Sequence, residues 1–132
     1  MRLVLDASAV MTFFEQRKGA EKIEEIIYEA MEGRSELLMS VLNWGEVYYS
    51  TWRTSGPIRA RRLGAEIAQL PIEIVDAGLE LTRSAAEIHV QHRLPYADSF
   101  AVALASTRRA ALATSDRDFT RVRDLVELIW IG

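Results

Sequence analysis

Five short apolar runs of β-forming character alternate with longer helical segments, and this alternation constrains the fold more than any other feature. The runs cover residues 3–5, 37–39, 72–75, 111–113 and 127–131. Helical patterns lie between them, at residues 10–14, 21–32, 41–54, 59–70, 77–92, 95–109 and 117–122. Strands separated by helices indicate an α/β fold with a parallel sheet of about five strands and helices on both of its faces.

The composition bounds the number of domains and the kind of metal site. With 132 residues, 49% of them hydrophobic, the chain suits one domain over residues 1–132. It has no cysteine and two histidines, so any metal would be held by oxygen. The apolar runs are far shorter than a membrane span and no signal-like segment opens the chain, so we expect no membrane contact and a cytoplasmic location.

The first strand runs directly into a carboxylate. Residues 3–5 are apolar, and Asp6 follows them, with Ser8 two residues later. Ligands of an open parallel sheet bind outside the carboxyl ends of the strands, which is where Asp6 would lie. Asp is also a preferred N-cap, so capping of the helix that begins near Ser8 is the alternative role.

A second acid lies on the helix at residues 41–54. Asn43, Glu46, Ser50 and Arg53 follow one another at steps of three and four and form one polar stripe on an otherwise apolar helix. The stripe is either an ordinary solvent face or a device that aims Glu46 at a site.

Two further segments supply acids. Asp98 begins a helix that is apolar nearly all round, where a carboxylate gains from the helix dipole but is costly to bury unless it is paired or binds a metal. Asp116 and Asp118 follow the fourth strand, beside Thr114 and Ser115, either as a cap and turn or as a polar cluster at the crevice.

A parallel sheet would bring all of these acids to one end. Carboxylates so gathered repel one another and stay ionised only with a counter-charge, which a hard divalent cation supplies. The sequence therefore predicts a Mg²⁺ or Mn²⁺ site. Metals held by carboxylates suit phosphoryl chemistry, because they activate water and neutralise charge on phosphate oxygens.

The motifs LDASA, NWGEV, YADSFAVALA and ATSDRDF, in this order, resemble those of the PIN-domain ribonucleases, and at this length those of the VapC-type toxins of toxin–antitoxin pairs. The likeness extends over residues 2–131. It implies a PIN-like fold and Mg²⁺- or Mn²⁺-dependent cleavage of single-stranded RNA. Carried over by position, it implies the following roles. The catalytic and metal-binding quartet is Asp6, Glu46, Asp98 and Asp116, with Asp118 as a further metal ligand and Ser8 and Thr114 as supporting hydroxyls. Asn43 occupies a variable position.

The resemblance also implies a homodimer and a VapB-type antitoxin that covers the active-site groove. Aromatic residues near the acids are consistent with such a surface; they are Phe13, Phe14, Trp44, Tyr48, Tyr49 and Trp52. Arginine supplies 14 of the 16 basic residues, a bias compatible with phosphate contacts. The candidate RNA-binding residues, which continue from the stripe of Glu46 into the next helix, are Arg53, Arg59, Arg61 and Arg62.

Other functions fit the sequence less well. A two-component receiver needs a lysine near the acids, and Lys18 and Lys22 lie on early surface segments. A haloacid-dehalogenase-type phosphatase needs a second Asp where Ser8 stands. An RNA-processing PIN-like nuclease outside a toxin–antitoxin pair, or an inactive module that binds a partner, remains as an alternative, and Mn²⁺-dependent stabilisation separates the inactive module from an enzyme.

Overall fold

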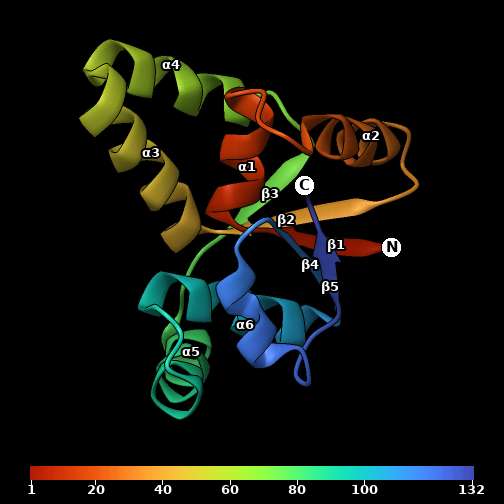
Figure 1. Cartoon of the computed structure of the whole chain (residues 1–132), viewed down its shortest axis with the longest axis vertical. Coiled ribbons are helices and arrows are strands. Elements are labelled where there is room, and N and C mark those ends of the chain that lie inside the picture. The colour runs from red at the N-terminus through yellow and green to blue at the C-terminus, as the bar shows by residue number, and fades with distance from the viewer.

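In the computed structural model, which describes residues 1–132, five parallel strands form one sheet in the order β3-β2-β1-β4-β5 (Figure 1). The strands are β1 (Arg2–Leu5), β2 (Glu36–Ser40), β3 (Ile72–Val75), β4 (Ala111–Thr114) and β5 (Leu128–Trp130). The central strand β1 pairs with β2 on one side and with β4 on the other. The chain therefore changes direction across the sheet between β1 and β4, where open α/β sheets bind their ligands.

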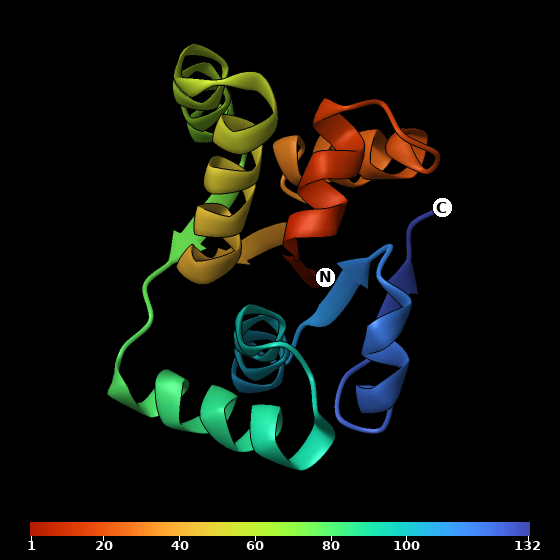
Figure 2. The same cartoon turned by 60° about the vertical axis from the view of Figure 1, so that its left-hand side comes forward.

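Helices cover both faces of the sheet, as the two views in Figures 1 and 2 show. One face carries α1 (Ala7–Phe14), α2 (Ala20–Met31), α3 (Val41–Ser55) and α4 (Pro57–Ala68). The other carries α5 (Leu79–His92), α6 (Tyr96–Arg108) and the 3₁₀ helix η1 (Arg117–Val122). The predicted α/β class is confirmed. None of these helices is both long and apolar enough to cross a membrane.

The alternation of side chains along each strand divides the core in two. Leu3 and Leu5 pack with α1 to α4, whereas Val4 packs with α5, α6 and η1. All three side chains are buried, and each contributes about 1.5–3 kcal/mol relative to an exposed position. Because β1 is apolar on both faces, it is fixed in the middle of the sheet, and the residue that follows it lies at the switch point.

The main difference from the predicted elements is the start of α1. The helix begins at Ala7, before the apolar pattern that starts at Val10 and next to the start near Ser8 that a cap by Asp6 implied. Asp6 does cap it: Ala9 N donates to Asp6 Oδ1 over 2.8 Å. The helix therefore begins directly at the carboxyl end of β1. The other elements lie within a few residues of their predicted positions.

Candidate active site

Asp6 is buried at the switch point and held by hydroxyl groups from both sides of it. The register of β1 and β4 pairs Leu5 with Ala113, so the next residues, Asp6 and Thr114, lie beside each other. Thr114 Oγ1 donates to Asp6 Oδ2 over 2.6 Å. Ser8 Oγ donates to Asp6 Oδ1 over 2.7 Å and accepts from Ser115 N over 3.0 Å. Asp6 is thus both the N-cap of α1 and a carboxylate fixed in one orientation, so the two roles considered for it are compatible.

Burial dominates the electrostatics of Asp6. The side chain is 2% exposed, and this desolvation raises the pKa of Asp6 from 3.8 to about 6 although its hydrogen bonds lower the pKa. The nearby charge of Asp116 raises the pKa further. A buried carboxylate with an unfavourable charge is a candidate for function, because a cation would relieve the cost.

Asp116 and Asp118 extend this site beyond β4. Asp116 caps η1, with Asp118 N donating to its Oδ1 over 2.9 Å, and Asp116 N donates to Thr114 Oγ1 over 2.9 Å. Thr114 therefore links the backbone before η1 to the carboxylate of Asp6. Asp118 is exposed and lies 3.8 Å from Arg121, so it stands at the rim.

Asn43 connects Glu46 on α3 to the first turn of α6. Asn43 Nδ2 donates to Glu46 Oε1 over 2.9 Å and to the carbonyl of Ala97, the residue before Asp98, over 3.2 Å. Asn43 is fully buried, and its Oδ1 has no hydrogen-bond partner. The sequence pattern placed Asn43 on the polar stripe but gave no reason to expect a positioning role. The only available signal was its spacing of three residues before Glu46 on one helix face.

Asp98 lies in the first turn of α6 and experiences the charges of the other four acids of the predicted site. Desolvation is the largest cause that raises the pKa of Asp98 from 3.8 to about 7, followed by the charge of Glu46. The charges of Asp116, Asp6 and Asp118 act in the same direction. Four carboxylates, from three other segments of the chain, therefore lie within electrostatic range of Asp98 at one end of the sheet.

No basic side chain forms an ion pair with Asp6, Glu46, Asp98 or Asp116. An oxygen-only donor set with uncompensated negative charge fits a hard divalent cation. As they stand, no three acidic or histidine side chains converge into a group that could hold a metal, so the predicted Mg²⁺ or Mn²⁺ site stays a prediction.

The predicted RNA-binding residues differ in ion pairing, and the aromatic residues differ in exposure. Arg59 is ion-paired with Glu66 over 3.0 Å, whereas Arg53, Arg61 and Arg62 form no ion pair and are exposed. Four of the six aromatic residues are only partly exposed; they are Phe13, Phe14, Trp44 and Tyr48. Only Tyr49 and Trp52 of the set are exposed.

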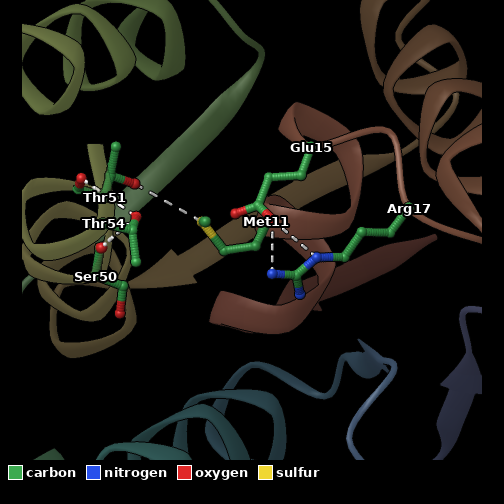
Figure 3. A network of polar contacts seen from close by, with 6 residues as sticks. All are labelled: Met11, Glu15, Arg17, Ser50, Thr51 and Thr54. Carbon is green, nitrogen blue, oxygen red and sulfur yellow. Dashed lines mark hydrogen bonds and ion pairs between the residues drawn. The ribbon is translucent and has the colours of Figure 1, made fainter.

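A cavity of about 410 Å³ lies away from the acids, between α1 and the α3–α4 hairpin. Figure 3 shows the polar contacts around it: Thr51 Oγ1 faces Met11 Sδ at 4.0 Å, and Arg17 pairs with Glu15 at 2.7 Å. Thr54 Oγ1 donates to the carbonyl of Ser50 over 2.9 Å. These polar groups are therefore paired with one another between α1 and α3. None of the predicted quartet lines the cavity.

Comparisons with known proteins identify similar sequences and similar folds. The PIN domain model matches residues 3–125, and a search of the curated proteins gave no match. VapBC2 from Rickettsia felis, bound to a DNA fragment from its promoter, superposes with a TM-score of 0.81 at 14% identity over 100% of both chains. DNA-bound VapBC from Salmonella typhimurium superposes with a TM-score of 0.75 at 15% identity, over 98% of this chain and 97% of the other. The sarcin-ricin loop cleaving toxin VapC20 from Mycobacterium tuberculosis superposes with a TM-score of 0.72 at 15% identity, over 91% of this chain and 94% of the other. At these identities the likeness establishes a shared fold.

Proposed function

Because the chain belongs to the PIN domain family, we propose that it is a Mg²⁺- or Mn²⁺-dependent endoribonuclease that hydrolyses phosphodiesters of single-stranded RNA. The observation that carries the proposal is the gathering of Asp6, Glu46, Asp98 and Asp116 at the switch point, with no basic side chain ion-paired to any of the four. We further propose that the protein acts in the cytoplasm as the toxin of a toxin–antitoxin pair. The similarity of the whole chain to solved VapBC structures supports this second step.

The proposed roles follow from what holds each side chain. Asp6, Glu46, Asp98 and Asp116 would hold the ion, with Asp118 completing the set from the rim. When bound, the ion supplies charge neutralisation at the phosphate and activation of the attacking water. Ser8 and Thr114 fix the orientation of Asp6, and Asn43 holds Glu46 against the first turn of α6. Asp98 accepts no side-chain or backbone hydrogen bond from the protein, so its carboxylate is free to turn toward a cation.

Metal binding is the first prediction, and it separates an enzyme from an inactive binding module. Mn²⁺ should raise the melting temperature of the metal-free protein, because the ion relieves the repulsion among the acids. At a concentration one hundred times the dissociation constant, the stabilisation is about 2.7 kcal/mol. Thermal melting in EDTA and in MnCl₂ measures it, and Asp98→Asn, the matched control, should lose most of the shift. If the melting temperature of wild type is the same in EDTA and in MnCl₂, the result would support an inactive binding module.

Assembly is the second prediction, and it tests the toxin assignment. We expect the purified protein to elute as a dimer and to lose ribonuclease activity when the product of the adjacent gene is added. The expected inhibitor is a short protein with a basic amphipathic segment, because the surface that it must cover carries the acids. Light scattering and RNA cleavage with and without that product are the measurements. Full cleavage in its presence, by a monomer, would leave an RNA-processing PIN nuclease outside a toxin–antitoxin pair.

A further inference from the structure

A row of aromatic rings on α3 ends in the exposed Trp52, the exposed ring of Tyr49 lies on the same helix, and an arginine lies over each of these two rings. Trp44 stacks on Tyr48 with 5.1 Å between ring centres, and Tyr48 lies 6.2 Å from Trp52. Tyr49 is 50% exposed and Trp52 is 43% exposed. The guanidinium of Arg53 lies 5.3 Å from the ring centre of Tyr49. That of Arg61, on α4, lies 5.3 Å from the ring centre of Trp52. We call Tyr49, Trp52, Arg53 and Arg61 the ring patch.

The ring patch borders a hollow. A cavity of about 330 Å³ is lined by Tyr48, Tyr49, Trp52 and Arg53. This volume lies at the lower end of the range of small-ligand sites, roughly 300–1,000 Å³. A planar group can therefore enter beside the two exposed rings.

The charge of the patch decides what kind of ligand suits it. Arg53 and Arg61 form no ion pair, in contrast to Arg59, which Glu66 neutralises. An apolar helix laid over the patch would bury two charges without partners, which is costly. Single-stranded RNA has the complementary chemistry, because its bases stack on rings and on guanidinium planes and its phosphates accept from arginine.

Two residues of the ring patch share a helix face with Glu46, so an RNA strand that leaves the acids along α3 would reach them. Glu46, Tyr49 and Arg53 stand three and four residues apart on α3 and so share one face of the helix. At the rise of an α-helix, Tyr49 is about 4.5 Å and Arg53 about 10 Å from Glu46 along the axis. This spacing corresponds to on the order of two or three nucleotides of a strand that rises about 3.4 Å per stacked base.

We infer that the ring patch is a binding site for single-stranded RNA, in which bases flanking the cleaved phosphodiester stack on Tyr49 and Trp52 while Arg53 and Arg61 contact phosphates. The inference rests on the proposed function for the nature of the substrate. It adds a base-stacking site that lies outside the acidic cluster and selects unpaired RNA, since bases within a duplex present no free face.

Binding is measured in EDTA, so that the test does not depend on cleavage. Fluorescence anisotropy of a labelled oligoadenylate gives the affinity of wild type, Trp52→Leu, Tyr49→Leu and Arg61→Gln. Loss of a base stack should weaken binding by at least about fivefold for each ring variant. Two matched controls should bind as wild type does: Tyr28→Leu, which removes a ring on α2 that is 58% exposed, and Arg83→Gln, which removes an arginine on α5 that is paired with Glu80.

An abasic version of the same oligonucleotide separates stacking from charge. Wild type should bind it several-fold more weakly than oligoadenylate, whereas Trp52→Leu should bind both alike. Arg61→Gln should instead weaken both oligonucleotides and reduce the salt dependence of binding, by a slope of roughly 0.7 for one phosphate contact. Melting curves of each variant exclude misfolding, and Tyr49→Leu tests the patch independently of the Trp52–Tyr48 contact.

The outcomes distinguish this inference from the proposed function. If wild type does not cleave RNA with Mn²⁺ but the ring variants lose oligoadenylate binding, the nuclease proposal fails and the ring patch stands. If wild type cleaves RNA and the ring variants bind oligoadenylate as tightly as wild type, the ring patch is overturned. Ring variants that become monomeric in light scattering with unchanged affinity per chain would overturn it as well, in favour of an interface between subunits.

Discussion

Asp98→Asn should lower RNA cleavage by at least two to three orders of magnitude and leave the protein folded. Stabilisation of transition-state charge by a metal is worth several kcal/mol, and each 1.36 kcal/mol is a factor of ten in rate. The change is nearly isosteric, and the Asp98 carboxylate lies near four other acids whose repulsion it relieves. Cleavage of single-stranded RNA at saturating Mn²⁺ is the measurement.

The other members of the quartet should show comparable losses of activity but different effects on stability. Ala9 N, Ser8 and Thr114 all donate to the carboxylate of Asp6, and Asp6→Asn replaces one of the two accepting oxygens by an amide group. The free energy of unfolding should therefore fall by about 1 kcal/mol. Glu46→Gln and Asp116→Asn should fold as wild type. Asp118→Asn should be milder in activity, because Asp118 stands exposed at the rim.

Asp76 provides the control for these substitutions. It also follows a parallel strand, β3, but it is exposed and does not perturb the pKa of Asp98. Asp76→Asn should therefore cleave RNA at the wild-type rate. Wild-type activity from any member of the quartet, or equal losses from Asp76→Asn, would contradict a shared site at the switch point.

Stability and activity should depend on pH in opposite directions. The pKa of Asp98 is about 7 and that of Asp6 about 6, both raised from 3.8, so the folded metal-free protein binds more protons than the unfolded chain between about pH 4 and 7. Its stability from these groups is therefore fully present below about pH 4 and is lost as the pH rises through 6 and 7. Cleavage at limiting Mn²⁺ should instead rise over this interval, about tenfold or more per unit, because the ion competes with the protons.

The difference between wild type and Asp98→Asn isolates this effect. The full shift of about three pKa units corresponds to roughly 4 kcal/mol, and partial exposure of Asp98 reduces this to about 1–2 kcal/mol through solvent screening. Asp98→Asn should therefore melt several degrees above wild type at pH 8 in EDTA, and the advantage should fade toward pH 4. A difference that stays constant over this range would contradict the raised pKa of Asp98.

The sequence by itself determined the layered architecture. Strands and helices are encoded by local periodicity, so the short apolar run at β1 and the amphipathic pattern of α2 could be recognised from neighbouring residues alone. Parallel strands joined by helices then bring their carboxyl ends to one edge, which is why Asp6 and Asp116 could be predicted to lie together. The same rule placed Asp98 and Glu46 on helices that begin at that edge.

Only the tertiary structure decided how these groups contact one another. Thr114 reaches Asp6 across 108 positions of the chain, and Asn43 reaches the carbonyl of Ala97 across 54, and such contacts leave no local pattern. The dual role of Asp6, as cap and as fixed carboxylate, became visible only with both partners in place.

Exposure was decided in the same way. Trp44 and Trp52 belong to the same aromatic series on α3, yet packing leaves Trp44 only partly exposed and Trp52 exposed. Arg59 and Arg61 are two residues apart on α4, but one meets Glu66 and the other lies over the ring of Trp52. Residue type and spacing specify which side chains are available, whereas the packing of α3 against α4 determines which of them remain free to bind a ligand.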